Sequence, residues 1–389
     1  MEGDLISTNK ALQPLSWLYG LGVGFRNLLF EMGILKSRSF SVPVISVGNI
    51  TVGGTGKTPH VEYLIRLLKG QCKVAVLSRG YKRKSHGFVL ADENSTVRVI
   101  GDEPYQMKTK FPDITVAVDR KRTRGITRLT SGDKDSQAGV ILLDDAFQHR
   151  YVKPGINIML VDYHRLIIYD QLLPSGRLRE PVKSKDRADI VIITKCPTDM
   201  KPMEYRVITK AMSLYPYQQL FFSTHEYEPL RPVFPKIAKK VDNLNGMNVL
   251  LLSGIASPEQ MFIDLQSRAS QITPLSFSDH HNFKKKDIQR INEAFAELPS
   301  PKVIITTEKD ETRLLNTEGL SDEVKRSLYV QPIRIKFMLN QEETFNKSII
   351  GYVRKNSRNS ILAKVKDDHK PKDSNSPGDR PRTISFRNN

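Results

Sequence analysis

Short apolar runs recur along the chain, and most are followed by a polar segment and then by apolar residues at helical spacing. Strands that are apolar on both faces are typical of parallel sheets, because helices cover both sides of such sheets. The pattern therefore predicts an α/β fold with a doubly wound, mostly parallel sheet. The alternating residues 88–100 predict a hairpin. The predicted strands of this first part lie at 44–47, 74–78, 114–118, 140–143, 156–161 and 190–194.

A second, shorter α/β series follows. Apolar runs at 248–252 and 303–306 predict strands, and residues 258–265 between them predict a helix. The proline-rich segment 221–241 predicts a connection between two domains, and the polar C-terminal residues lack periodicity, which is typical of disorder. The expected division is a core at 37–235, a smaller α/β domain at 236–355 and a disordered polar tail at 356–389.

An apolar segment at residues 12–36 precedes the first predicted strand. Its uninterrupted part, 17–25, would span only about 13 Å as a helix, whereas a bilayer core is roughly 30 Å thick. Arg26 and Glu31 place charges in the remainder of the segment. The segment therefore predicts an amphipathic, membrane-associating helix with Trp17 at the headgroup level. A helix packed on the domain of a soluble protein is the alternative.

The first predicted strand leads into a glycine-rich loop within PVISVGNITVGGTGKTP, residues 43–59. Glycines let backbone N–H groups surround phosphate oxygens, while Lys57 would reach the β- and γ-phosphates and the Thr58 hydroxyl would hold Mg²⁺. The general pattern G-x-x-x-x-G-K-[ST] asks for glycine where this chain has Thr51. The strand before the loop and the helix after it still predict a P-loop NTPase-like core. The predicted nucleotide-binding residues are Thr51, Val52, Gly53, Gly54, Thr55, Gly56, Lys57 and Thr58.

Two acids, Asp144 and Asp145, directly follow the apolar run 140–143. A Mg²⁺ ion held by Thr58 requires a carboxylate across the crevice, and an acid at the end of a neighbouring strand supplies it. The loop and the acids together predict binding of a nucleoside triphosphate with Mg²⁺. An ordinary turn is the alternative for the acids.

Polar loops after other predicted strands carry further candidates. The basic loop 79–84 follows the second run, where a parallel sheet opens onto its ligand crevice. The loop LLPSGRLREP, residues 172–181, places Arg177, Arg179 and Glu180 where they would cover a phosphate or a metal ion.

Two histidines and two acids outside these loops are further candidates. His280 and His281 lie in FSDHHNF, residues 277–283, where either could act as an acid or a base near neutral pH. A solvated loop is the alternative. Asp102 and Glu103 of GDEP have an adequate structural explanation as the first-turn acids of a helix.

The formal charge of +18 favours partners that carry phosphate, such as nucleic acid, an anionic membrane or a phosphorylated small molecule. The basic residues are spread over loops and the tail instead of clustering with aromatic residues, which disfavours nucleic acid. Cys72 and Cys196 have no metal-type spacing and form no disulfide framework, so we expect two thiols in a reducing compartment.

Several motifs occur in the order VGNITVGGTGKTP, LSRGY, GDEP, LLDDAFQH, LLPSGRLREP, DHH and TEKD. In this order they resemble the tetraacyldisaccharide 4'-kinase family, over roughly residues 12–350. That family phosphorylates the lipid A disaccharide precursor with ATP and Mg²⁺. Two departures concern Ala146, where the family usually has glycine, and the loop RGYKRK, which is more basic than its RGYGG-like counterpart.

The resemblance implies roles for individual residues. Lys57 and the loop would bind ATP, Asp102 would take the proton of the attacking sugar hydroxyl, and His280 would orient Asp102 from the second domain. The implied catalytic residues are Asp102, His280, Asp144 and Asp145. The implied metal ligands are Thr58, Glu103, Asp144, Asp145 and Glu180. The implied contacts to substrate or phosphate are Arg79, Gln148, His149, Arg177 and Arg179.

The resemblance also implies partners and a location. A monomer that binds a lipid disaccharide and a membrane surface, but no nucleic acid, is expected. The tail 356–389 is not part of the family pattern and suggests a eukaryotic organellar member in the mitochondrion; the cytoplasmic face of a bacterial inner membrane is the alternative. A P-loop kinase acting on a soluble small molecule is the alternative function. A GTPase is disfavoured, because Thr194 stands where the base-reading N-K-x-D stretch has asparagine.

Overall fold

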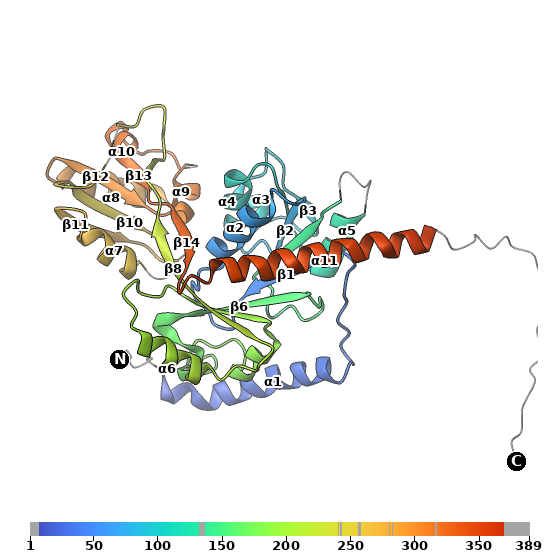
Figure 1. The fold of residues 1–389 in the computed structure, drawn as a ribbon. Coiled ribbons are helices and arrows are strands. Elements are labelled where there is room, and N and C mark those ends of the chain that lie inside the picture. Colours follow the sequence, from blue (N-terminus) through green and yellow to red (C-terminus); the bar gives the residue numbers. More distant parts are fainter. Residues whose placement is uncertain are drawn as a thin grey trace, which may run out of the picture.

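The computed structural model describes residues 8–131, 137–239, 241, 243–255, 258–279, 281, 283–315 and 317–368 of the 389 residues. Its strands form two sheets (Figure 1). The larger sheet has nine strands in the order β14-β8-β7-β6-β1-β5-β2-β4-β3, and the smaller has five in the order β11-β10-β12-β13-β9. The prediction of a large, mostly parallel α/β sheet is confirmed.

The strand order of the larger sheet reverses at its central strand, β1. β1 lies between β5 and β6 and is parallel to both, although both follow it in the chain. Among the described residues of this sheet, the antiparallel pairs are β3–β4 and β8–β14. A doubly wound sheet opens a ligand crevice at such a point, outside the carboxyl ends of the strands. The strands are β1 (Val44–Gly48), β2 (Val74–Ser78), β3 (Val89–Leu90), β4 (Thr115–Val118), β5 (Val140–Asp144), β6 (Ile156–Asp162), β7 (Ile190–Thr194), β8 (Gln219–Tyr227) and β14 (Ile333–Phe337).

Helices cover both faces of the larger sheet. One buried cluster joins the sheet to α2, α4 and α11, and the clusters of the opposite face include α5 and α6. The helices of this part are α2 (Lys57–Leu68), α3 (Val97–Ile100), α4 (Asp102–Lys110), α5 (Arg122–Thr130), α6 (Pro202–Met212) and α11 (Glu342–Asp368). Short 3₁₀ helices are η1 (Lys10–Leu12), η2 (Tyr163–Arg165), η3 (Ile167–Tyr169) and η4 (Val182–Arg187).

The smaller sheet is covered in the same way. Buried residues of α7 pack on one face, and those of α8, α9 and α10 pack on the other. Its strands are β9 (Arg231–Pro232), β10 (Asn248–Ser253), β11 (Gln271–Ser276), β12 (Lys302–Thr306) and β13 (Leu328–Val330). Its helices are α7 (Glu259–Gln266), α8 (Lys285–Glu297), α9 (Glu308–Leu314) and α10 (Asp322–Ser327).

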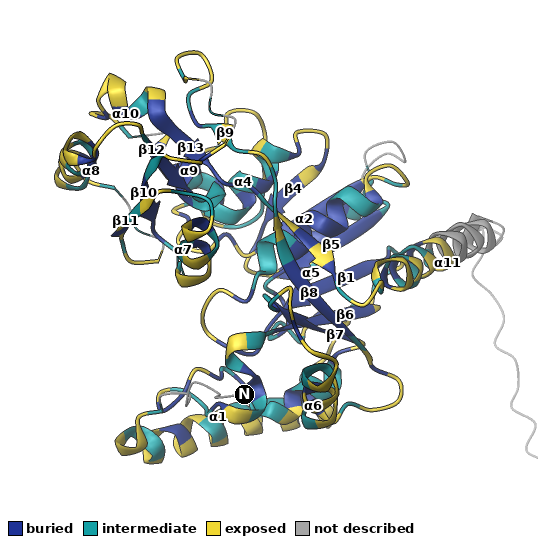
Figure 2. Cartoon of the chain, turned by 60° about the vertical axis from the view of Figure 1, so that its left-hand side comes forward, coloured by how far each residue is buried: buried dark blue, intermediate teal, exposed yellow. Residues whose placement is uncertain are grey.

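The N-terminal helix α1 (Gln13–Glu31) lies along the edge of the larger part, at the bottom of Figure 1. Ser16 and Phe30 are its buried residues, and Figure 2 shows exposed positions along its length. One side packs on the 172–181 loop: Ser16 Oγ donates to the carbonyl of Leu172 at 3.0 Å. Within the described part of the chain, no helix combines the length and apolar character needed to cross a membrane.

Two expectations about local structure are wrong. In place of the hairpin at 88–100, only β3 forms, and the helical turn α3 follows. Val97 and Ile100 are three residues apart, a spacing that suits a helical turn, and Ile100 is fully buried. The segment 221–241 is also not a plain connection, because β8 occupies its start. The prolines of this segment come after Tyr227, so they end the strand without interrupting it.

The chain crosses between the two sheets at places other than the expected boundaries. It leaves the larger sheet after Tyr227 and returns at Ile333, so residues 333–355 pack on the larger sheet and not on the smaller one. Residues 356–368 continue helix α11, in contrast to the disorder expected from residue 356. Leu, Ala and Lys in this stretch favour helix despite its polar character. The rest of the predicted tail, 369–389, lies outside the described residues.

Candidate active site

The loop after β1 is organised by a buried asparagine that the sequence interpretation missed. Nδ2 of Asn49 donates to Oγ1 of Thr51 at 3.2 Å and to Oγ1 of Thr55 at 2.8 Å. Thr51, which departs from the general phosphate-loop pattern, therefore has a role in holding the loop. Gly53 and Gly56 have φ angles of +111° and +78°, which side chains disfavour. Helix α2 begins directly after Gly56, so the N–H groups of its first turn face the loop.

The 172–181 loop runs antiparallel to the phosphate loop. The N–H of Val52 donates to the carbonyl of Arg177 at 2.8 Å, and the N–H of Arg179 donates to the carbonyl of Ile50 at 2.7 Å. Both arginines predicted in this loop are thereby brought to the phosphate loop. Their side chains differ: that of Arg177 is exposed, whereas Arg179 bonds to Asn49.

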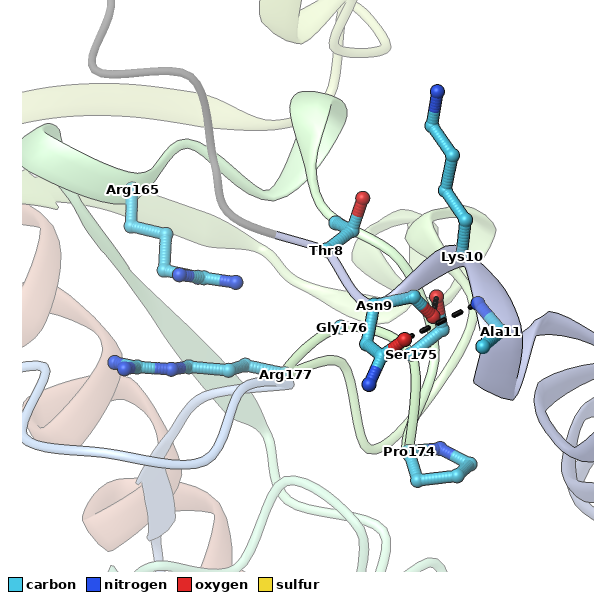
Figure 3. A pocket seen from close by; sticks show the side chains of 9 residues that line it. All are labelled: Thr8, Asn9, Lys10, Ala11, Arg165, Pro174, Ser175, Gly176 and Arg177. Carbon is cyan, nitrogen blue, oxygen red and sulfur yellow. Dashed lines mark hydrogen bonds between the residues drawn. The ribbon is translucent and has the colours of Figure 1, made fainter.

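An open pocket of about 690 Å³ adjoins this region (Figure 3). Arg165 and Arg177 line it on the left of the view, and Lys10 lies on the right. Arg165 is held by Asp170 at 2.7 and 3.0 Å, so its charge is already paired. Its lining brings residues 8–11, which precede α1, next to residues 174–177 of the 172–181 loop.

A lysine and an arginine meet one of the two predicted acids. Nζ of Lys57 lies 3.5 Å from Oδ1 of Asp145, and Nη2 of Arg179 lies 3.2 Å from the same oxygen. Burial by itself would raise the pKa of Asp145, but Lys57 and Arg179 outweigh it and lower the pKa to about 2. Asp145 is thus an anion between two cations.

The other acid, Asp144, is buried at the end of β5. Ser78 donates its hydroxyl to Oδ2 of Asp144 at 3.0 Å. Burial, followed by the negative charges of Glu103 and Asp145, raises the pKa of Asp144 to about 7. Two adjacent carboxylates therefore differ in protonation near neutral pH, because their surroundings differ.

A buried arginine, Arg122, which the sequence did not single out, binds the backbone next to Asp144 and Asp145. Nη2 of Arg122 donates to the backbone carbonyl of Asp144 at 3.1 Å, and Nη1 donates to that of Asp119 at 2.9 Å. Burial lowers the pKa of Arg122 to about 10. Its position within the basic segment 120–129 was visible in the sequence, but its burial was not.

The expected metal ligands are only partly gathered. Thr58 lies in the first turn of α2, and Glu103 in the first turn of α4. Glu180 is buried and accepts a bond from Arg187 at 2.5 Å, so its charge is already paired. Among the described residues, no three His, Cys, Asp or Glu side chains are arranged to hold a metal ion. Asp144, Asp145 and Glu103 are near enough for their charges to interact.

The segment after the acids joins the site to α1. Nε2 of Gln148 donates to the carbonyl of Asn49 at 2.5 Å, and the carbonyl of Gln148 accepts a bond from Arg26 at 3.2 Å. Nε2 of His149 is buried and has no hydrogen-bond partner within the described part of the chain. Burial, followed by the charges of nearby arginines that include Arg79, lowers the pKa of His149 to about 4. His149 is therefore a neutral imidazole near the crevice.

Ala146, where the family usually has glycine, fits its position. It is buried in the core, and the left-handed residue of the turn is its neighbour Asp145, with φ of +46°. The extra methyl group therefore meets no backbone strain.

The first residue of α4, Asp102, faces the smaller sheet. Its Oδ2 lies 2.7 Å from Nη2 of Arg313 in α9. Lys309 of the same helix lies 3.8 Å from Glu103 and 3.2 Å from Asp279. The predicted partner of Asp102, His280, lies outside the described residues, so this pairing stays a prediction.

The neighbouring histidine is engaged elsewhere. Nε2 of His281 lies 2.9 Å from Oδ2 of Asp287 in the first turn of α8, and its ring stacks on Phe277. His281 is thus tied to the smaller sheet. Together, the glycine loop, the cations around Asp145 and the buried Asp144 form a site suited to phosphate oxygens and a hard cation.

Known proteins resemble this chain over most of its length. The profile of the tetraacyldisaccharide-1-P 4'-kinase family matches residues 8–354. The tetraacyldisaccharide 4'-kinase of Bacteroides thetaiotaomicron is 54% identical over 379 residues, which cover 95% of this chain and 100% of that protein. The tetraacyldisaccharide 4'-kinase of Flavobacterium johnsoniae is 46% identical over 349 residues, which cover 89% of this chain and 98% of that protein.

A solved structure agrees with these relatives. LpxK from Aquifex aeolicus, crystallised in complex with ATP, has a TM-score of 0.66 and 29% identity, covering 88% of this chain and 98% of that one. All of these relatives are bacterial, so the expectation of a eukaryotic organellar member in the mitochondrion finds no support. The chain belongs to the tetraacyldisaccharide-1-P 4'-kinase family.

Proposed function

We propose that this protein transfers the γ-phosphoryl group of ATP to the 4' hydroxyl of a tetraacylated glucosamine disaccharide 1-phosphate, a step of lipid A biosynthesis. The observation that carries the proposal is the family match over residues 8–354, together with relatives of about half identical sequence that bear this activity in their names. The phosphate loop and its acids lie within that match.

The site fits ATP and Mg²⁺. Lys57 and the N–H groups of the loop as far as Thr58, apart from that of Val52, which donates to Arg177, would bind the phosphates of ATP. Asp144 and Asp145, with the Thr58 hydroxyl and with Glu103 nearby, offer the oxygen ligands that Mg²⁺ prefers, and the ion would neutralise charge on the transferred group. Mg²⁺ is usually held by one or two carboxylates, phosphates and water, so a dedicated cage of three acids is not required. Glu180, paired with Arg187, would act on this site indirectly.

Asp102 and His280 would serve the acceptor side. Asp102 would accept the proton of the sugar hydroxyl, the sugar oxygen would bond to the γ-phosphorus, and the bond from phosphorus to the bridging oxygen would break to leave ADP. His280, which lies outside the described residues, would orient Asp102; its neighbour Asp279 lies 3.2 Å from Lys309. Substrate and phosphate contacts would come from Arg79, Gln148, His149, Arg177 and Arg179.

The acylated substrate would be reached at a membrane surface. Leu18, Leu21 and Phe25 on α1 are each more than 60% exposed, although they are large and apolar. An interfacial helix would bury these side chains among lipid chains while its other side stays packed on the 172–181 loop. We propose a monomer bound to the cytoplasmic face of a bacterial inner membrane. Its kinase core would be built on the larger sheet and a smaller domain on the second sheet.

A lipid-kinase assay tests the proposal. Purified full-length protein should convert an acylated disaccharide 1-phosphate to its bisphosphate with Mg²⁺ and ATP, with one ADP formed per lipid product. The deacylated disaccharide, presented at the same concentration, should be a much poorer substrate. Hydrolysis of ATP without a lipid product would overturn the proposal. Equal rates with both substrates would favour a kinase for soluble small molecules.

A further inference from the structure

Helix α9 presents two cations to the first turn of α4. Lys309 and Arg313 are one helical turn apart and therefore lie on the same side of α9. Lys309 pairs with Glu103 at 3.8 Å, and Arg313 pairs with Asp102 at 2.7 Å. The acids thus meet cations that come from the smaller sheet, more than 200 residues later in the chain.

The Arg313 side chain is buried and is held in place by several hydrogen bonds. Its side chain is only 4% exposed. Nη1 bonds to Oδ1 of Asp310 at 3.0 Å and to the carbonyl of Gly254 at 3.4 Å, while Nη2 bonds to Asp102. A guanidinium group held by two partners in one plane points its remaining N–H groups in a fixed direction.

Asp310, the last residue of the TEKD motif, is itself immobilised. It is fully buried, and its Oδ2 accepts bonds from the N–H of Gly254 at 2.9 Å and from the hydroxyl of Thr307 at 2.8 Å. A continuous series of hydrogen bonds therefore runs from Gly254 and Thr307 through Asp310 and Arg313 to Asp102. Two other ion pairs, from Glu308 to Lys110 at 2.6 Å and from Lys309 to Glu103 at 3.8 Å, also join α9 to α4. Attaching the two helices to each other thus does not require Arg313.

We propose that Arg313, anchored by Asp310, is a positioning residue for Asp102. The proposal rests on the function proposed above, in which Asp102 accepts the proton of the sugar hydroxyl. The bond to Oδ2 fixes the plane of the carboxylate and hence the direction of its other oxygen. The orientation of the Asp102 carboxylate thus depends on how α9 packs against α4.

Replacement of Arg313 tests this assignment. R313Q should lower kcat for lipid phosphorylation by about 100-fold, because misplacing a catalytic group by about 1 Å costs that much. KM for ATP should change less than about twofold, since Arg313 is not part of the phosphate loop. R313K keeps the charge but lacks the rigid planar fork of the guanidinium group, so its kcat should lie between those of R313Q and the wild type.

R231Q is a matched control. Arg231 also forms a paired bond to a carboxylate of α9, at 2.6 and 2.5 Å to Glu311, but it does not contact Asp102. Its kcat should stay within about twofold of the wild type. If R231Q loses as much activity as R313Q, general attachment of α9 explains both losses and the positioning role is wrong.

A double-mutant cycle separates positioning from packing. If Arg313 acts through Asp102, R313Q should reduce kcat of a D102N enzyme by less than about twofold. A full additional loss in D102N, or a rise in kcat on removing Arg313, would overturn the inference. If R313Q fails to fold, as checked by thermal unfolding, the same cycle is run with R313K. Absence of lipid phosphorylation by the wild type would instead overturn the proposed function.

Discussion

The ammonium group of Lys57 lies 3.5 Å from Oδ1 of Asp145. This contact joins the phosphate loop to the end of the neighbouring strand β5. Each of these residues is charged and partly exposed, so each supplies the other with a counter-ion. Phosphates that enter the loop would replace the carboxylate as partner of Lys57. Asp145 would then become available to a cation bound with those phosphates. This relationship leads to a first prediction.

Removal of the Lys57 charge should impair catalysis much more than stability. K57M should lower kcat by about 100- to 1000-fold, because a preorganised cation facing the transferred phosphate is lost. The midpoint of thermal unfolding should change little, since the ion pair with Asp145 is partly exposed. Steady-state kinetics and calorimetry measure the two effects. K336M, which breaks the exposed pair with Glu226, is the control and should keep full activity. Retention of half the activity by K57M would exclude its role.

The high pKa of Asp144 predicts an unusual dependence of stability on pH. Its pKa is about 7 in the folded chain and about 4 in an unfolded one. Between about pH 4 and pH 7 this carboxyl is ionised in the unfolded chain but still protonated in the folded one. The free energy of unfolding of the wild type therefore falls as the pH rises through this range. In the presence of a chelator, D144N should exceed the wild type at pH 8 by up to about 4 kcal/mol. The advantage should shrink toward pH 4 and vanish below it.

The control for this prediction is S78A. The Ser78 hydroxyl donates to the charged form of Asp144 and lowers its pKa. Its removal should destabilise the protein at pH 8 more than at pH 4. Denaturant unfolding at several pH values measures both variants. A D144N advantage that is the same at pH 4 and pH 8 would contradict the assigned cause.

The exposed apolar side of α1 should determine membrane binding. L18Q/L21Q should weaken binding to anionic liposomes by about 10- to 100-fold, because two leucine side chains no longer enter the lipid. Both leucines are exposed, so the unfolding temperature should not fall. I263Q, at a similarly exposed position on α7, should bind liposomes normally. Point variants are preferable to a deletion of the helix, because a deletion would also remove the contact from Arg26 to Gln148. Unchanged flotation of L18Q/L21Q would mean that this side of α1 is not the anchor.

Close packing between β1 and the segment after Asp145 should make Gly48 sensitive to substitution. A Cβ atom at Gly48 would lie 2.7 Å from Cβ and 2.8 Å from the backbone nitrogen of Phe147. G48A should therefore destabilise the protein by about 1–3 kcal/mol and displace the acids. G22A is the control, since a Cβ atom there meets no neighbour within 4 Å and alanine favours helix. Equal unfolding temperatures for G48A and the wild type would show that the backbone relaxes at no cost.

Features carried by neighbouring residues could be predicted from the sequence. Buried parallel strands are apolar along their whole length, so β1, β2 and β5 were recognisable as short runs. The glycines of the phosphate loop and the acids after β5 follow such runs directly, because a ligand crevice forms where parallel strands end. Strands β8 and β14, which pair antiparallel, were not predicted. Strand β8 ends in a proline-rich segment, and β14 alternates apolar and polar residues at the edge of the sheet.

Contacts between distant segments were decided only by the tertiary structure. The sequence by itself determined that Lys57 follows a glycine loop and that Asp145 ends a strand, but their 3.5 Å approach required β5 to pair with β1. The bond from Arg313 to Asp102 depends on how the smaller sheet sits on α4. Burial, which separates the pKa values of Asp144 and Asp145, also depends on the packed fold. The physical reason is that charge and burial act through space, whereas a sequence pattern records only neighbours along the chain.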